Sequence, residues 1–325
     1  MRFSKFRAHF IIFSILLGVF LYGVTFLKHG GFAKSISFNG GIRLTVQMPS
    51  GVGTKEIEDS LKKIEITDAQ VRLSNVAANQ YDLEFGPKVR ERIETILKEN
   101  EKKQEEELKK TGKTAPHETG SKSVAEELER MLLPVLGVTK DNVISRESIS
   151  PSFASDLFRI STWGFLLTIA LIGIYLYFRF TFPFAVGASL SLIHDVVLTL
   201  GFIGATQIEP STPVLAAVLT LIGYSINDTI VIFDRIRSNV QDHEQFSLPA
   251  TMDLAMTQTL SRTVVTSLLT LLSVFALLFG GAVSLRDFSL VLIFGIVIGT
   301  YSSIFIAAHY VQYYDEFKTW WRSRK

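Results

Sequence analysis

Acidic side chains inside apolar stretches are the residues of this sequence that could do chemistry. Asp228 lies in the run from Gly223 to Arg237, inside an apolar stretch that begins near Pro213. A carboxylate in the core of a bilayer costs roughly 2.5 to 3.5 kcal/mol even on permissive insertion scales, so such a group usually faces protein or water and often has a function. We therefore expect Asp228 to handle a proton or another cation.

A second acid, Asp195, follows His194 near the middle of another apolar stretch. Successive residues of a helix point about 100° apart, so these two side chains are not expected to pair directly. Asp195 would then need a nearby hydroxyl group as its partner. The sequence leaves open whether Asp195 is a structural hydrogen-bonding group or a second titrating site.

Other polar residues near Asp228 have two interpretations each. Asn227 either orients Asp228 by a hydrogen bond or faces a neighbouring helix. Hydroxyl groups recur at helical spacing on a later apolar stretch, and they either line a proton path or form a surface where helices pack. These hydroxyl residues are Thr263, Thr266, Ser267, Thr270 and Ser273.

Six apolar segments must position these residues, and each has about the 17 to 25 residues that a membrane-spanning helix needs. They run from Phe10 to Leu27, Ile160 to Phe178, Phe184 to Ile203, Pro213 to Phe233, Thr263 to Phe279 and Phe288 to Ala308. Because Lys28 and the residues after it offer no small-residue cleavage site, the first segment is expected to remain as an anchor. Between the fourth and fifth segments, residues 247–259 have one apolar face and are expected to lie along the membrane surface.

The composition agrees with a membrane protein that carries a polar insert. Of 325 residues 47% are hydrophobic and 25 are Phe, whereas the net charge is only +2, so we expect no nucleic-acid partner. With no Cys, the chain has no disulfide or thiolate site. It also has no phosphate-binding loop, metal-spaced His cluster or nucleophile constellation, so we expect no enzyme activity, no metal and no cofactor.

Basic residues indicate the orientation of the chain. Residues 2–7 hold Arg2, Lys5 and Arg7, and alternation of the spans puts Arg179, Arg235, Arg237 and the C-terminal Lys/Arg residues on that same side. The positive-inside rule therefore places both termini in the cytoplasm. In a bacterium, the long segment between the first two spans would lie in the periplasm.

That segment is expected to form a small α+β domain. Residues 41–47 alternate between apolar and polar, which predicts a strand, and further strands are expected at 70–74, 81–85 and 142–148. Helices are expected at 54–64, with Thr54 as N-cap, and at 124–136. The expected division is residues 1–28 (N-terminus and first helix), 29–158 (inserted domain, with a charged extension at 88–123), 159–310 (five helices) and 311–325 (basic tail).

Several motifs together resemble the SecF branch of the SecD/SecF family of bacterial protein-export membrane subunits, within the resistance-nodulation-division superfamily. They are the run from Gly223 to Arg237, residues 258–267, Gly280-Gly281, residues 299–307, His194-Asp195-Val196 and Phe38-Asn-Gly-Gly41, with Ser37 where the family has an acid. The resemblance implies a multi-pass protein of the bacterial inner membrane. It implies SecD, the SecYEG channel and YajC as partners, an exported unfolded polypeptide as substrate, and protons as the coupling ion.

The resemblance also assigns residue roles, because the family's transport-linked acid matches Asp228 and its basic partner matches Arg262. The fourth span ends about 7 to 8 Å of helix beyond Asp228. Arg262 opens the fifth span from that same side, so its long side chain can reach inward to the Asp228 carboxyl group. A movement that separates the two would change the proton affinity of the carboxyl group. The alternatives are a static ion pair in a non-conducting scaffold, and a proton-coupled lipid or small-molecule transporter of the same superfamily.

Overall fold

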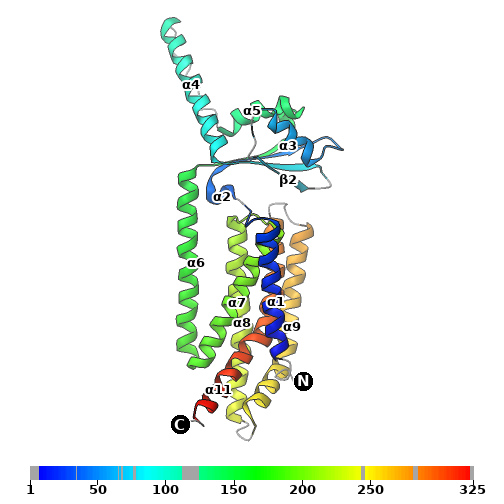
Figure 1. Ribbon diagram of the computed structural model, residues 1–325, viewed down its shortest axis with the longest axis vertical. Coiled ribbons are helices and arrows are strands. Elements are labelled where there is room, and N and C mark those ends of the chain that lie inside the picture. Colours follow the sequence, from blue (N-terminus) through cyan, green and yellow to red (C-terminus); the bar gives the residue numbers. More distant parts are fainter. Residues whose placement is uncertain are drawn as a thin grey trace. The chain divides into compact units, whose positions relative to one another are not determined.

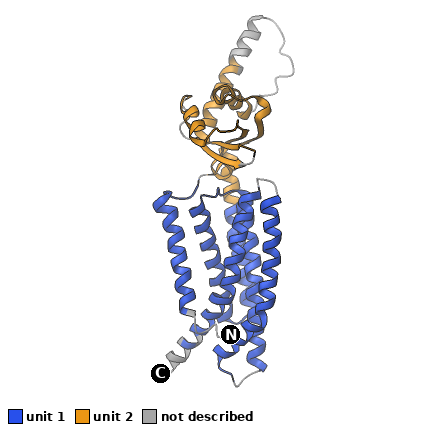
Figure 2. Ribbon diagram, turned by 90° about the vertical axis from the view of Figure 1, so that its right-hand side faces the viewer, with its two compact units in different colours: residues 1–33, 161–325 blue, residues 34–160 orange. Residues whose placement is uncertain are grey.

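The computed structural model describes residues 7–33, 35–64, 66, 69–75, 78–111, 124–242, 246–280 and 285–322. The chain divides into two compact units, one formed by residues 1–33 with 161–325 and the other by residues 34–160 (Figure 2). Within the described residues, six helices are long and apolar enough to cross a membrane, and a four-stranded sheet lies in the chain between the first and second of them. The expected fold class is confirmed.

Five of the six candidate spans lie wholly in the helical unit, and the remaining one, Pro151–Arg179, begins with ten residues that belong to the other unit (Figure 1). The helices of these spans are α1 (Arg7–Gly23) with a π-helical turn (Val24–Lys28), α6 (Pro151–Arg179), α7 (Phe182–Thr206), α8 (Thr212–Asp242) and α9 (Leu248–Gly280), and a last span made of α10 (Arg286–Ser302), a π-helical turn (Ser303–Ala307) and α11 (Ala308–Arg322). Four of the helices, α6, α8, α9 and the last one, run well past the apolar stretches of the sequence. The apolar stretches set which part of a helix can lie in hydrocarbon, while the helix itself continues into polar residues.

The expected surface helix at residues 247–259 is not a separate element. From Leu248 on, these residues form the first turns of α9, and the buried side chains of Met252, Ala255 and Met256 pack in one cluster with Ile232 and Phe233 of α8. The apolar face that suggested a membrane surface is therefore covered by protein.

Close packing of α8 against α10 fixes the polar part of α8 in the bundle. α8 contacts α7, α9 and α10, and α10 also contacts α7 and α9. A Cβ atom added to Gly295 would lie 2.9 Å from Leu221 Cδ2, and one added to Gly299 would lie 3.0 Å from Ser225 Cβ. The two glycines let α10 approach the side of α8 that carries Ser225, as small residues do at other helix interfaces in membranes.

The second unit is an antiparallel sheet of order β2-β3-β1-β4, built from β1 (Gly41–Gln47), β2 (Gln70–Asn75), β3 (Gln80–Phe85) and β4 (Val143–Ile149). Three helices belong to it, α3 (Thr54–Lys62), α4 (Pro87–Thr111) and α5 (Val124–Leu136), together with the short α2 (Ile36–Asn39) and a 3₁₀ turn (Lys140–Asn142). Alternate side chains of β1, from Ile42 to Val46, pack with Leu128 of α5 and Leu61 of α3 in one core. The residues between them are polar, and Arg43 binds both Glu84 and Glu147.

Adjacent glycines begin β1 because the backbone there leaves no room for a side chain. Gly40 has φ of +77° and Gly41 has φ of +146°, both in a region that favours glycine. A Cβ atom on Gly41 would lie 2.2 Å from the Phe85 carbonyl oxygen. This close approach gives the Gly-Gly pair of the early sequence motif a structural reason.

One helix start differs from the expectation. Helix α3 begins at Thr54, and its N-cap is Gly53, whose N–H donates to the Glu56 carboxylate at 3.4 Å. Gly53 occupies the extended cap position and Glu56 satisfies its amide, so Thr54 is already in the helix. Of the expected charged extension at 88–123, residues 112–123 lie outside the described residues.

Candidate functional site

Asp228 is buried in the middle part of α8, with 4% of its surface exposed. Its Oδ2 atom is buried and has no hydrogen-bond partner among the residues that the structure describes. Buried polar atoms without a protein partner are rare in folded proteins, and they mark strain, a functional group or a group that binds water or an ion. Among the described residues of the bundle, Asp228 is therefore a buried acid that has one carboxylate oxygen without a protein partner.

Arg262 lies on α9, next to a cleft between α8 and α9. Its side chain is exposed and forms no ion pair with Asp228, because no guanidinium nitrogen lies within 4 Å of a carboxylate oxygen. The guanidinium is still close enough to act on that carboxyl group electrostatically. The cleft has a volume of about 450 Å³. It is lined by Val231, Asp234, Arg235 and Ser238 of α8 and by Gln258, Thr259 and Arg262 of α9. Val231 is three residues after Asp228, so the cleft ends within about one turn of the buried acid.

The supporting candidates near this pair lie in different surroundings. Asn227 is exposed and makes no hydrogen bond to Asp228. The Thr266 hydroxyl donates to the Arg262 carbonyl at 3.0 Å, and the Thr270 hydroxyl donates to the Thr266 carbonyl at 2.9 Å, so both are satisfied within α9. Ser267 instead reaches across to Thr300 of α10 at 2.8 Å. The hydroxyl stripe thus includes one contact that joins two helices.

Thr263 follows Arg262 and is more deeply placed than its neighbours. It is 1% exposed, and its hydroxyl oxygen has no hydrogen-bond partner among the described residues. Tyr224 of α8, one helical turn before Asp228, also has a buried hydroxyl group without a partner. Two facing helices, α8 and α9, thus both carry buried polar atoms with unused hydrogen-bonding capacity.

Asp195 is the second buried acid and differs from Asp228 in being fully bonded. It is 1% exposed. Its Oδ2 accepts hydrogen bonds from the hydroxyls of Ser225 of α8 at 2.5 Å and Ser302 of α10 at 2.7 Å. Ser191 donates in turn to Ser302 at 3.1 Å. Asp195 therefore joins α7, α8 and α10 through one carboxylate.

The expectation that His194 and Asp195 do not pair is wrong. His194 Nδ1 lies 2.9 Å from Asp195 Oδ1. Helical spacing fixes the directions of the Cα–Cβ bonds only, and rotation about the side-chain bonds still brings the imidazole ring to the carboxylate. His194 Nε2 is buried and has no partner among the described residues.

Sequence reasoning missed the serines that complete this network. Ser225, Ser302 and Ser303 lie inside the two motifs at residues 223–237 and 299–307, yet serine is common at helix contacts of every kind. Ser303 bonds to Thr229 at 2.9 Å and to the Ser225 carbonyl at 3.2 Å. The usable signal was that each motif places serine in an apolar stretch two or three residues after a glycine, Gly223 or Gly299.

This arrangement can hold one acid rigidly and leave the other free to change its state. Asp195 is fixed by three hydrogen bonds, whereas Asp228 has an unsatisfied oxygen and a nearby guanidinium at the edge of a cleft. Within the described part of the chain, no group of three His, Asp or Glu side chains is placed to hold a metal ion. The chemistry that the geometry offers is gain and loss of a proton at Asp228.

Comparison with known proteins gives a consistent result. The family model for protein export membrane protein SecD/SecF, C-terminal, matches residues 134–317. Protein translocase subunit SecF of Borreliella burgdorferi is 32% identical over 311 residues, which is 94% of this chain and 95% of that protein. SecF of Haemophilus influenzae is 41% identical over 193 residues, 59% of this chain and 58% of that protein.

The match to SecF of Rickettsia bellii, like that to the Haemophilus protein, spans little more than half of the relative. It is 42% identical over 160 residues, which is 49% of this chain and 53% of that protein. Among solved structures, the crystal structure of SecDF from Thermus thermophilus, described as a translocon-associated membrane protein, superimposes with a TM-score of 0.77 at 30% identity. That match covers 97% of this chain and 39% of the Thermus chain. A family model that covers more than half of the chain, and a relative that aligns over nearly all of it, show that the chain belongs to the SecD/SecF family of protein export membrane proteins.

Proposed function

We propose that this chain is an accessory subunit of the Sec protein-translocation machinery, and that with SecD it uses the proton-motive force to promote export of polypeptides through the SecYEG channel. The names of the relatives support this role, since they are protein translocase subunits. The observation that carries the coupling part of the proposal is the buried Asp228 carboxyl group, which has an oxygen without a partner.

Asp228 and Arg262 form the proton-coupling pair of this proposal. When the guanidinium is near, the carboxyl group is favoured in its ionised form; when the two separate in a buried site, the neutral form is favoured. The cleft beside Arg262 gives water a route from one end of the helices toward Asp228. A movement of α9 relative to α8 would then alternate proton release and uptake.

The Asp195 network has a supporting role in this mechanism. It ties the Ser225 turn of α8 to α7 and α10. A fixed α8 lets a movement of α9 change the distance between Asp228 and Arg262, instead of moving both residues together.

Both termini lie in the cytoplasm in this proposal, and the inserted domain, residues 34–160, lies in the periplasm of a bacterium. The distribution of Lys and Arg supports this orientation. There the inserted domain would contact the emerging, unfolded polypeptide and move with the helices.

SecD is the expected partner in the membrane, with YajC as a further component. The SecDF protein of Thermus thermophilus supports this partnership, because the chain aligns at 34% identity with only 36% of that protein. The remaining part of the Thermus protein would correspond to the SecD half of a complex. Affinity purification in mild detergent should recover SecD and SecYEG; recovery of neither would contradict the proposal.

A complementation experiment tests the proposed function. Cells depleted of the chain should accumulate unexported precursor proteins, and wild-type chain should restore export. Asp228→Asn, expressed at the same level, should fail to restore it, whereas Asp242→Asn, which alters an exposed acid at the end of α8 that does not line the cleft, should restore it. Normal export with Asp228→Asn would favour a scaffold, and a change in lipid composition without an export defect would favour a lipid transporter.

A further inference from the structure

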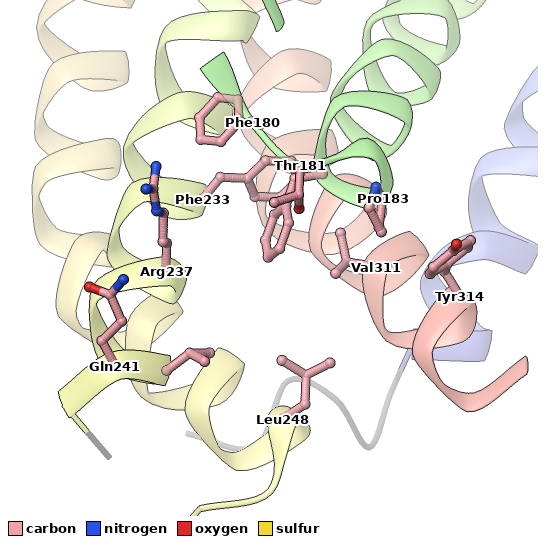
Figure 3. A pocket seen from close by; sticks show the side chains of 11 residues that line it. Phe180, Thr181, Pro183, Phe233, Arg237, Gln241, Leu248, Val311 and Tyr314 are labelled. Carbon is pink, nitrogen blue, oxygen red and sulfur yellow. The ribbon is translucent and has the colours of Figure 1, made fainter. Parts of the chain in front are cut away.

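A pocket at one end of the helical unit takes no part in the proposed proton coupling. It lies where α7 begins and α8 ends, and it has a volume of about 280 Å³. α11 and the first turn of α9 complete its walls. Figure 3 shows Arg237 and Gln241 of α8 on one side, Val311 and Tyr314 of α11 on the other, and Leu248 of α9 below.

The walls of this pocket are mostly apolar. Phe180, Phe184, Phe233, Val240, Leu248 and Val311 provide hydrocarbon surface. The pocket also lies where the apolar part of the helices ends, which is the depth at which lipid headgroups meet acyl chains. A pocket with such walls at such a depth suits hydrocarbon that is already in the membrane.

Arg237 gives the pocket a positive charge that no acidic residue in the described part of the chain neutralises by an ion pair. Its side chain is exposed, and it makes no ion pair or hydrogen bond to any residue that the structure describes. The nearby arginines differ: Arg179 pairs with Asp234 at 2.6 Å, and Arg235 donates to Gln258 at 2.7 Å. A guanidinium group beside an apolar pocket can bind a phosphate oxygen without giving up another partner.

We propose that this pocket binds one anionic phospholipid, with part of an acyl chain against the apolar walls and the headgroup phosphate on Arg237. Arg237 is the last residue of the motif that begins at Gly223, and the proton-coupling proposal gives it no role. A bound lipid would hold the ends of α7, α8 and α11 together. This site is separate from Asp228, so its failure and the failure of the proton-coupling proposal are distinguishable.

Native mass spectrometry of the full-length chain, purified in detergent and titrated with phosphatidylglycerol or phosphatidylcholine, tests this proposal. The wild-type chain should retain phosphatidylglycerol about fivefold better than phosphatidylcholine, as expected for one basic residue at a membrane surface. Arg237→Gln should abolish this preference. Val240→Trp should lower the binding of both lipids, because Val240 is 43% exposed and a larger side chain there fills the pocket without disturbing the core.

Arg235→Gln serves as the matched control, because Arg235 is exposed on the same helix and does not line this pocket. It should bind phosphatidylglycerol like the wild type. Equal retention of the two lipids by the wild type, or unchanged retention by Arg237→Gln and Val240→Trp, would overturn the proposal. Displacement of the lipid by millimolar inorganic phosphate would show a site for free anions, and would overturn it too.

Discussion

Two buried carboxyl groups in the same helical unit differ in their hydrogen bonding, and this difference separates their roles. Asp195 is bonded to His194, Ser225 and Ser302, whereas Asp228 has a buried oxygen with no partner. A fully bonded buried carboxylate stabilises the helices that it joins, while an unsatisfied one costs free energy in the resting structure. We therefore expect opposite consequences when each is replaced by alanine.

Asp195→Ala should lower the free energy of unfolding by about 1 to 3 kcal/mol, because it leaves buried donors on α8 and α10 without an acceptor. Asp228→Ala should lower it by less, or raise it, because no hydrogen bond is lost. Thermal unfolding of both variants in the same detergent measures the difference. Equal stability of Asp195→Ala and the wild type would show that the network does not hold the helices together.

Sequence reasoning found the acids but not their partners. Asp195 and Asp228 stand out because acids are rare in apolar stretches. The contact between His194 and Asp195 depends on side-chain conformations that helical spacing does not determine. The roles of Ser225 and Ser302 depend on how α8 and α10 cross, which the sequence does not specify.

At the scale of the helices, the crossing of α8 and α10 sets the geometry of the site. Gly299 allows α10 to approach the backbone of α8 at Ser225, and the π-helical turn Ser303–Ala307 follows directly. Ser303, the first residue of this turn, bonds to α8 through the Ser225 carbonyl. A change at Gly299 should therefore act on the Asp195 network without altering any of its hydrogen-bonding groups.

Gly299→Leu should push α10 away from α8, because an added Cβ atom would already lie 3.0 Å from Ser225 Cβ. We expect the free energy of unfolding to fall by about 1 to 3 kcal/mol, as it does when other well-packed interiors receive a larger side chain. Gly223→Leu is the matched control, since nothing lies within 4 Å of a Cβ atom there. Thermal unfolding of both variants checks this; similar behaviour of the two would contradict the close crossing.

The elements that the sequence predicted best were those with a clear periodicity. The strand at 41–47 and the helix at 124–136 have the expected bounds, since each buries alternate or helically spaced apolar residues in the domain core. Less was predictable where a neighbour decides the outcome. The apolar face of residues 247–259 could pack equally well on a membrane surface or against α8. Only the folded structure shows that it packs against α8.

At the scale of the whole molecule, the proposed orientation of the chain across the membrane can be tested with single introduced cysteines. The natural chain has no Cys, so a single introduced cysteine reports on one position only. In intact cells, a membrane-impermeant maleimide should label Asp141→Cys, an exposed site of the inserted domain, and should not label Asp242→Cys, at the exposed end of α8. After the cells are lysed, both variants should react. Labelling of Asp242→Cys in intact cells would reverse the orientation.

Proton movement in vesicles that contain this chain together with SecD tests the central claim most directly. With a membrane potential imposed, wild-type vesicles should take up protons, and Asp242→Asn should preserve this uptake, since Asp242 is exposed at the end of α8 and does not line the cleft. Asp228→Asn should reduce uptake to the level of empty vesicles, because an amide cannot gain and lose a proton in this range. Uptake by Asp228→Asn at the wild-type rate would contradict a coupling role for Asp228.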